Sequence, residues 1–131
     1  MAEILVVDDD HDTADTLADV IGMEGHEVRV AYNGLEGLRA LDARLPDLVV
    51  IDVEMPQLDG PGMAYGMLVE DLGREKIPIV ISSGVVDLPT VAARVGTPYY
   101  VQKPVSLPAL MSVLARALVE HRAPSTDGPS A

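Results

Sequence analysis

The sequence predicts an α/β fold in which helices cover both faces of a parallel sheet. Three observations support this prediction. Short runs of apolar, largely β-branched residues recur along the 131-residue chain, and most are apolar at every position instead of at alternate positions. Segments with apolar residues at helical spacing separate these runs. Strands that are apolar on both faces and are joined by helices are typical of parallel sheets that are buried on both sides.

The first half of the chain alternates between these two patterns. Asp10 or Asp12 can cap the first helix, and Gly22 and Gly25 can end it. In chain order we expect a strand at residues 4–7, a helix with Ala14, Leu17, Ala18 and Ile21 on its apolar face, a strand marked by Val28 and Val30, a turn at Asn33-Gly34, a helix with Leu35, Leu38 and Leu41, and a strand at residues 48–51.

The second half repeats the alternation. Pro89 has no backbone N–H and suits only the first turn of a helix, so the short helix over residues 90–95 should begin near Asp87 to Pro89. In chain order we expect a helix at residues 60–72, a strand at residues 77–81 with Pro78 near its start, that short helix, a strand at residues 99–101, and a helix with Leu107, Leu110, Met111, Leu114 and Leu118. Residues 1–122 would form one domain, and residues 123–131 a disordered tail or a truncated linker.

Composition excludes several classes of protein. No run of about 18 apolar residues exists, so we expect no membrane-spanning helix. The chain has no cysteine, which excludes disulfides, thiol nucleophiles and cysteine-bound zinc. Residues 1–60 hold fifteen Asp and Glu against three Lys and Arg, residues 61–131 hold six of each, and no basic patch for nucleic acid is present. An acidic segment stands where a signal peptide would be basic, and we expect a cytoplasmic protein.

Polar residues follow the predicted strands at one edge of the sheet. The strands run into Asp8-Asp9 after the first, Asp52 after the third, Ser82-Ser83 after the fourth and Lys103 after the fifth. In open parallel sheets, functional sites form outside the carboxyl ends of the strands. We therefore expect these side chains to meet in one site.

The residue types at this edge suit phosphoryl chemistry. Three carboxylates repel one another, and a hard divalent cation with oxygen ligands relieves that repulsion; no His or Cys ends a strand, so Mg²⁺ is favoured over zinc. Asp52 lies in the middle of the edge, where its carboxylate can attack a phosphoryl group and form an acyl phosphate. Lys103 and a serine hydroxyl would then stabilise the phosphoryl oxygens. Spacing from Pro78 favours Ser83 for this role, with Ser82 as the alternative.

Four motifs on these strand ends carry a family resemblance. They are Val6-Val7-Asp8-Asp9, Asp52-Val53-Glu54-Met55-Pro56 followed by Asp59-Gly60, Ser83-Gly84, and Tyr100-Val101-Gln102-Lys103-Pro104. With all four in this order, the chain resembles a receiver domain of the bacterial response-regulator family over about residues 2–121. The resemblance implies a flavodoxin-like, doubly wound fold, with a five-stranded parallel sheet in the order 2-1-3-4-5 and five flanking helices.

The resemblance also implies a phosphorylation site. Asp52 matches the aspartate that accepts the phosphoryl group in this family. Asp8 and Asp9 match the acidic pair, of which one residue usually binds Mg²⁺ directly and the other through water. The residue two positions after the phospho-acceptor usually gives Mg²⁺ its backbone carbonyl, and here that residue is Glu54.

Three further positions match residues that respond to phosphorylation. Ser83 matches the hydroxyl that hydrogen-bonds the phosphoryl group, and Lys103 matches the lysine that pairs with it. Tyr100 matches the aromatic residue whose rotamer follows the phosphorylation state. The chain departs from the family pattern at Gly84, where an alanine is common after the hydroxyl.

The function implied is a phospho-accepting switch of a two-component or phosphorelay system. A sensor histidine kinase or a phosphotransfer protein would donate the phosphoryl group to Asp52. The surface made by the fourth helix, the fifth strand and the last helix would respond, and we expect output through contact with a downstream protein target, unless the chain is a fragment of a longer regulator. Such a phospho-acceptor assists its own phosphorylation and dephosphorylation and is not a turnover enzyme.

Two other functions stay open at this point. One is a Mg²⁺-dependent phosphohydrolase that forms an aspartyl phosphate with a small substrate. Such haloacid-dehalogenase-like enzymes have a second aspartate two residues after the nucleophile, where this chain has Glu54, and a cap domain does not fit in 131 residues. The other is a binding module that works without phosphorylation, which the complete set of acids disfavours.

Overall fold

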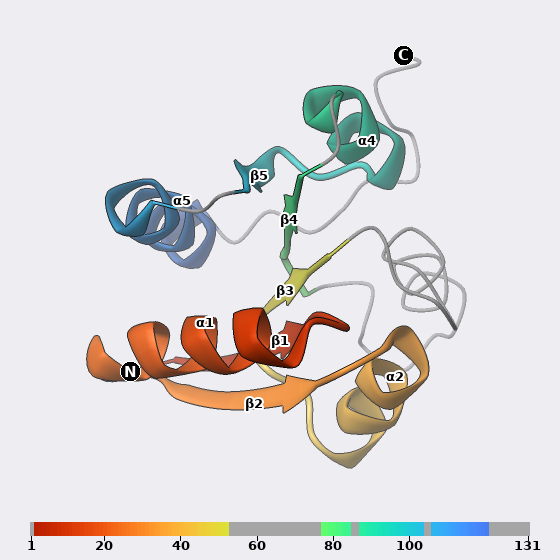
Figure 1. The fold of residues 1–131 in the computed structure, drawn as a ribbon, viewed down its shortest axis with the longest axis vertical. Coiled ribbons are helices and arrows are strands. Elements are labelled where there is room, and N and C mark those ends of the chain that lie inside the picture. Colours follow the sequence, from red (N-terminus) through yellow and green to blue (C-terminus); the bar gives the residue numbers. More distant parts are fainter. Residues whose placement is uncertain (1, 53–76, 85–86, 104–105, 121–131) are drawn as a thin grey trace.

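A computed structural model describes residues 2–52, 77–84, 87–103 and 106–120. The helix expected at residues 60–72 and the tail expected at residues 123–131 lie outside the described residues. The chain forms a five-stranded, all-parallel sheet in the order β2-β1-β3-β4-β5, which confirms the predicted topology (Figure 1). The strands are β1 Glu3–Val7, β2 Glu27–Ala31, β3 Leu48–Ile51, β4 Ile79–Ser83 and β5 Tyr99–Gln102.

Helices cover both faces of the sheet, as expected. They are α1 His11–Met23, α2 Gly34–Ala43, α4 Leu88–Val95 and α5 Leu107–Glu120. In Figure 1, α1 and α5 lie on one face of the sheet, and α2 and α4 on the other. Successive strand residues point to opposite faces, so Val50 and Val80 pack with α1 and α5, whereas Ile51 and Ile81 pack with α2 and α4. None of the helices described is long and apolar enough to cross a membrane.

The β1–α1 connection ends in a helix cap that also orders the acidic segment. Asp10 is the N-cap of α1, as one of the two predicted alternatives, and its Oδ1 accepts a hydrogen bond from the Thr13 backbone N–H at 3.1 Å. This bond lowers the pKa of the Asp10 carboxyl below its usual value, because it favours the charged form. The helix therefore starts directly after the acidic pair that ends β1.

Asn33 has a different role from the turn that we expected. Its side chain caps α2 by accepting a hydrogen bond from the Glu36 backbone N–H at 2.9 Å, and Glu36 Oε1 accepts one from the Tyr32 N–H at 3.0 Å. The expected apolar face of α2 is confirmed at Leu41, which is buried, and at Leu38, which packs against the core. Leu35 differs from the expectation, because it is 44% exposed.

The strand β4 lies two residues later in the chain than expected. We predicted residues 77–81, but Ser82 and Ser83 form the last two positions of the strand, where they pair with β5. Pro78 precedes the strand because it has no N–H for the ladder. Consecutive strand residues point to opposite faces, so the two serines are not equivalent.

The short helix α4 begins at Leu88, within the predicted range. Pro89 lies in its first turn, where a missing N–H costs no hydrogen bond. Ala92 is buried, and Val91 packs against the core beside it. Gly96 ends the helix with a φ of 89°, in the left-handed region that glycine adopts without a steric penalty.

Candidate functional site

Asp8 and Asp52 stand side by side at the ends of neighbouring strands. The register that pairs Val7 with Ile51 continues by one residue, because the Asp52 backbone N–H donates to the Val7 carbonyl at 2.9 Å. Both aspartates are buried, with 1% and 7% of their surface exposed. The parallel pairing of β1 with β3 thus brings together two carboxylates that are distant in the sequence.

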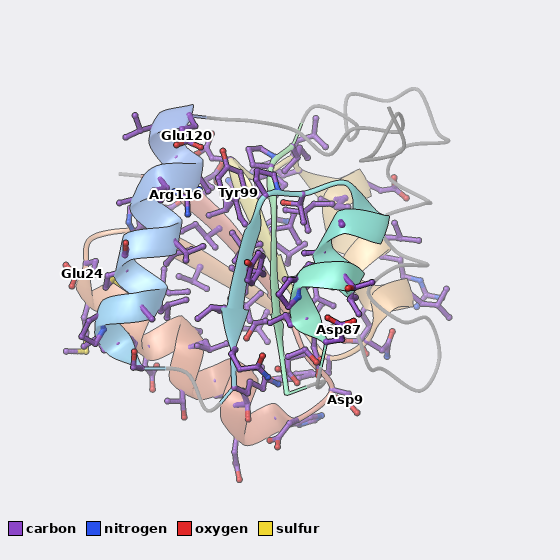
Figure 2. The ribbon with its side chains drawn as sticks, turned by 90° about the horizontal axis from the view of Figure 1, so that it is seen from above. Asp9, Glu24, Asp87, Tyr99, Arg116 and Glu120 are labelled. Carbon is purple, nitrogen blue, oxygen red and sulfur yellow. The ribbon has the colours of Figure 1, made fainter. Side chains whose placement is uncertain are left out.

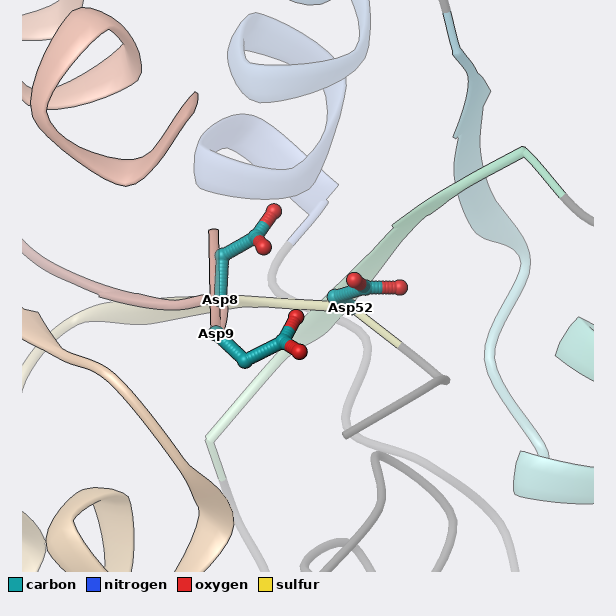
Figure 3. Close-up of side chains that lie close together, drawn as sticks. All are labelled: Asp8, Asp9 and Asp52. Atoms are coloured by element: carbon teal, nitrogen blue, oxygen red, sulfur yellow. The ribbon is translucent and has the colours of Figure 1, made fainter. Parts of the chain in front are cut away.

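Asp9 completes a cluster of three carboxylates. Asp8, Asp9 and Asp52 each offer one oxygen, and these oxygens lie within 4.8 Å of one another (Figure 3). Asp9 is exposed, whereas the other two side chains are buried. The Asp10 backbone N–H donates to Asp8 Oδ1 at 3.0 Å, which orients that carboxylate. The sequence prediction that these three acids meet at one edge is confirmed.

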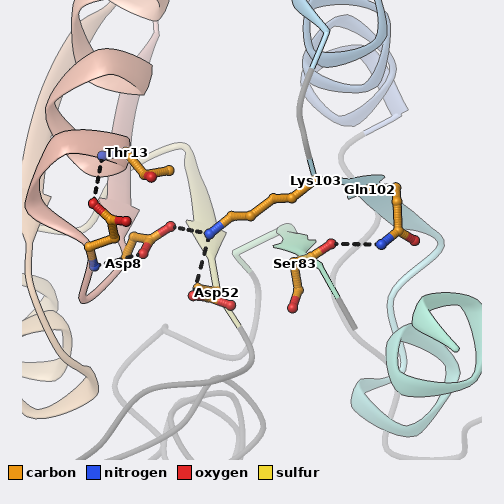
Figure 4. Close-up of polar contacts among 7 residues, drawn as sticks. Asp8, Thr13, Asp52, Ser83, Gln102 and Lys103 are labelled. Atoms are coloured by element: carbon orange, nitrogen blue, oxygen red, sulfur yellow. Dashed lines mark hydrogen bonds and ion pairs between the residues drawn. The ribbon is translucent and has the colours of Figure 1, made fainter. Parts of the chain in front are cut away.

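Lys103 reaches into the cluster from the end of β5. Its Nζ lies 2.7 Å from Asp8 Oδ2 and 3.4 Å from Asp52 Oδ2 (Figure 4). Its backbone N–H donates to the Ser83 carbonyl at 2.9 Å, which holds the residue in place after the strand. Burial lowers the pKa of Lys103, but the hydrogen bond that Lys103 donates to Asp8 and the charges of Asp52 and Asp8 outweigh burial and raise the pKa above its usual value. Lys103 is therefore a firmly charged ammonium group.

The donor set fits a hard divalent cation. All three clustered side chains offer carboxylate oxygen, which Mg²⁺ and Ca²⁺ prefer, and no thiolate or imidazole belongs to this cluster. Three carboxylates against one ammonium also leave a net negative charge in a largely buried place. A cation of charge two would offset that excess.

The remaining predicted site residues fall into different places. Ser83 is buried at the end of β4, and its carbonyl accepts a hydrogen bond from Gln102 Nε2 at 3.2 Å (Figure 4). Tyr100 is 40% exposed on β5, so its side chain has access to the surface. Glu54 lies outside the described residues. The roles that the sequence assigns to these residues stay predictions.

Sequence reasoning missed a contact beside the acid cluster. His11, the first residue of α1, stacks on Tyr32 with ring centroids 3.8 Å apart and an angle of 18° between the rings. The Tyr32 hydroxyl donates to Asp15 Oδ1 at 2.9 Å, which raises the pKa of Tyr32 above its usual value. The stack joins the start of α1 to the β2–α2 connection. No sequence pattern indicates it, because the two rings are far apart in the chain.

A groove between α1 and α5 was also not predicted. It has a volume of about 380 Å³ and opens beside Lys103. Its walls are mainly apolar, and they are formed by Asp12, Thr13, Thr16, Leu17, Val20, Lys103, Leu107 and Leu110. Helical spacing marks Leu17, Leu107 and Leu110 only as apolar positions, so this pattern gives no sign that they line a groove.

The far end of α5 is tied to β5. The Tyr99 hydroxyl donates to Glu120 Oε1 at 3.0 Å, and the Arg116 guanidinium lies 5.7 Å from the centre of the Tyr99 ring (Figure 2). Tyr99 is fully buried and is the neighbour of the exposed Tyr100. The strand that carries the predicted switch tyrosine is therefore fastened to the last turn of α5.

Comparison with known families decides the identity of this arrangement. The sequence model of one protein family, the response regulator receiver domain, matches residues 4–115 of this chain. These residues include the acid cluster, both serines and Lys103. The chain belongs to this family. The resemblance that the strand-end motifs predict is thus confirmed, and the chain is a receiver domain, the phospho-accepting switch module of two-component systems.

Two related regulators support the assignment. The chain is 31% identical to the transcriptional regulatory protein PrrA of Mycobacterium tuberculosis over 129 residues, which cover 97% of this chain and 54% of PrrA. It is 32% identical to the response regulator MprA of Mycobacterium avium over 132 residues, or 97% of this chain and 55% of MprA. The receiver domain thus spans about half the length of these two regulators.

Solved structures agree with the fold. The receiver domain aligns with NtrX from Brucella abortus at a TM-score of 0.82 and 31% identity, over 92% of this chain and 27% of NtrX. It aligns with a response regulator receiver domain protein from Clostridium thermocellum at a TM-score of 0.80 and 27% identity, over 92% of this chain and 96% of that one.

Proposed function

We propose that Asp52 of this receiver domain accepts a phosphoryl group from a sensor histidine kinase or a phosphotransfer protein, with Mg²⁺ bound at the acid cluster. The observation that carries the proposal is the contact of Lys103 with Asp52 inside the cluster of three carboxylates. Asp52 is the acid on the central strand of the sheet, between the acidic pair of β1 and the lysine of β5.

Each residue of the cluster has a separate role in the proposed phosphoryl transfer. A carboxylate oxygen of Asp52 forms a bond to phosphorus while the bond from phosphorus to the donor's histidine nitrogen breaks, and the electron pair of that bond stays on the nitrogen. Asp8 and Asp9 would hold Mg²⁺ together with Asp52. The cation, when bound, supplies positive charge near the phosphoryl oxygens. Lys103, whose ammonium group contacts Asp52, would supply a second positive charge there.

Phosphorylation would change the surface through the end of β4 and through β5. The new dianionic group attracts hydrogen-bond donors, and Ser83 is the predicted donor at the end of β4. The Ser83 backbone carbonyl accepts a hydrogen bond from the Lys103 N–H, and β4 pairs with β5, the strand that carries Tyr100. A shift of Ser83 would therefore reach the exposed Tyr100. We propose that the surface of α4, β5 and α5 presents this change to a downstream protein in the cytoplasm.

The labelling of Asp52 tests the proposal. The purified chain is treated with acetyl phosphate and Mg²⁺, and intact-mass spectrometry counts the phosphoryl groups gained. We expect one group on the wild type and none on Asp52→Asn, because an amide is not a nucleophile. Asp12→Asn, which changes an exposed acid on the first turn of α1, is the matched control and should label as the wild type does.

Two results would contradict the proposal. Full labelling of Asp52→Asn would show that another residue is the nucleophile. Sustained release of product from a small phosphoester over many cycles would show a phosphohydrolase instead of a phospho-acceptor. If Asp52 is labelled, a phosphotransfer profile against histidine kinases of the same organism identifies the donor.

A further inference from the structure

Ser82 carries a buried polar group that the proposed function does not use. The residue is 1% exposed, and its hydroxyl has no hydrogen-bond partner within the part of the chain that the structure describes. A buried hydroxyl without a partner is costly, because it has lost its hydrogen bonds to water. Such groups are rare in folded proteins, and a catalytic role is one of the explanations for those that persist.

The sheet places this hydroxyl beside Asp52. Ile51 pairs with Ile81 across β3 and β4, so the next residues along the two strands, Asp52 and Ser82, are neighbours. Adjacent strands lie about 4.8 Å apart, and a change of side-chain rotamer can bring a serine hydroxyl to a carboxylate oxygen over that distance.

Alternation along the strand separates the two serines. Val80 packs with α1 and α5, and Ser82 lies two residues further, on the same face. Asp52 lies on that face too, because Val50 packs with the same two helices. Ser83 follows Ile81 on the opposite face. Ser82 therefore places a second hydroxyl near Asp52. This hydroxyl lies on the opposite face of the sheet from the Ser83 side chain.

We propose that Ser82 is a positioning residue that shortens the life of the phosphorylated state by donating a hydrogen bond to Asp52. The bond goes to the carboxyl oxygen that is not attached to phosphorus. This inference rests on the proposed function of Asp52. In the structure Lys103 already contacts Asp52 Oδ2, and the oxygens of a carboxyl group have lone pairs for more than one donor.

The chemistry of hydrolysis gives the direction of the effect. A water oxygen bonds to phosphorus, the bond between phosphorus and the Asp52 oxygen breaks with its electron pair returning to the carboxylate, and both protons of the water stay on the inorganic phosphate that leaves. Negative charge then spreads over both carboxylate oxygens. A hydrogen bond to a charged oxygen is stronger than one to a neutral carbonyl, so the Ser82 hydroxyl stabilises the products and the transition state that leads to them.

The lifetime of the label tests this inference. The wild type and its variants are labelled with acetyl phosphate and Mg²⁺, the donor is removed by desalting, and the loss of the phosphoryl group is followed by intact-mass spectrometry. We expect Ser82→Ala to lose the group roughly fivefold more slowly, the size expected for one hydrogen bond that strengthens as charge develops. Ser82→Thr keeps a hydroxyl and should lose it at the wild-type rate.

Matched controls separate positioning from packing. Ser112→Ala makes the same chemical change at an exposed site on α5 and should leave the lifetime unchanged. Thermal melting of each variant reports stability, and Ser82→Ala should melt no lower than the wild type because it removes an unpartnered buried hydroxyl. Equal lifetimes of the wild type and Ser82→Ala would overturn the inference, as would a Ser82→Thr lifetime as long as that of Ser82→Ala. Failure to label the wild type at Asp52 would instead overturn the proposed function.

Discussion

Lys103 lies closer to Asp8 than to Asp52. Its Nζ is 2.7 Å from Asp8 Oδ2 but 3.4 Å from Asp52 Oδ2. The lysine that is predicted to meet the phosphoryl group is thus held mainly by a predicted metal ligand. An ammonium group and a divalent cation compete for the same carboxylate, so binding of the cation should release Lys103 toward Asp52. This competition gives the acid cluster a measurable signature.

Removal of the lysine charge should tighten cation binding. Lys103→Met keeps the length of the side chain but removes the ammonium group that contacts Asp8, so the cluster gains one net negative charge. We expect the Mg²⁺ affinity to rise severalfold in isothermal titration calorimetry, while labelling by acetyl phosphate slows. Arg116→Met, on the far end of α5, is the control for loss of a positive charge. Weaker Mg²⁺ binding by Lys103→Met would refute the competition.

Asp9 should contribute strongly to cation binding although it is exposed. Asp9→Asn removes the charge of a group whose oxygen lies in the cluster, whereas Asp12→Asn removes the charge of an acid outside it. Changes to outer partners of a metal site typically cost about 10–100-fold in affinity, so loss of a predicted ligand should cost at least about tenfold. Calorimetric titration measures the Mg²⁺ affinity of both variants. Equal losses of affinity would show that the acid cluster is not the cation site.

The pairing of Lys103 should make stability fall at alkaline pH. The folded-state pKa of Lys103 lies above its ordinary value of 10.5, so the folded protein holds this proton more tightly than the unfolded chain does. The stabilisation is complete below the unfolded-state pKa and is lost as the pH rises through the raised folded-state pKa. We expect the difference in free energy of unfolding between the wild type and Lys103→Met to shrink from neutral pH to above 10.5, as measured by urea unfolding without divalent cations. A constant difference would contradict this assignment.

The stack of His11 on Tyr32 should stabilise the start of α1. Tyr32→Ala removes both the stack and the hydrogen bond to Asp15, whereas Tyr32→Phe removes only the hydrogen bond. We expect Tyr32→Ala to lower the melting temperature more than Tyr32→Phe does, because aromatic pairs contribute beyond the area that they bury. Because His11 lies two residues after Asp9, Tyr32→Ala should also weaken Mg²⁺ binding. Identical melting temperatures of the two variants would show that the stack adds nothing.

Local patterns in the sequence account for most of the fold. The strand at residues 48–51 could be predicted because Leu48–Ile51 is apolar on both faces, and a parallel sheet is the arrangement that buries such a strand. The site followed from the same argument. All strands of a parallel sheet end at one edge, so Asp8, Asp52 and Lys103 had to approach one another once the strands were recognised.

Two local predictions, the end of β4 and the turn at Asn33-Gly34, were wrong because contacts outside the local pattern set the structure there. Residues 77–81 are the most apolar stretch of their region, yet β4 extends through Ser82 and Ser83 because β5 offers them backbone partners. Asn33-Gly34 is a common turn sequence, but Glu36 three residues after Asn33 converts it to a helix cap. In both cases a hydrogen-bonding partner decided the structure.

The sequence by itself determined the order of strands and helices, the excess of negative charge, and the set of acids and the lysine that meet at one edge. Only the tertiary structure decided that Lys103 prefers Asp8, that His11 stacks on Tyr32, and that the Ser82 hydroxyl is buried beside Asp52 without a partner in the described part of the chain. The physical reason is the difference in range. Strand and helix patterns depend on residues a few positions apart, whereas side-chain contacts across strands depend on the register of the sheet and on rotamers, which are set only when the whole sheet is assembled.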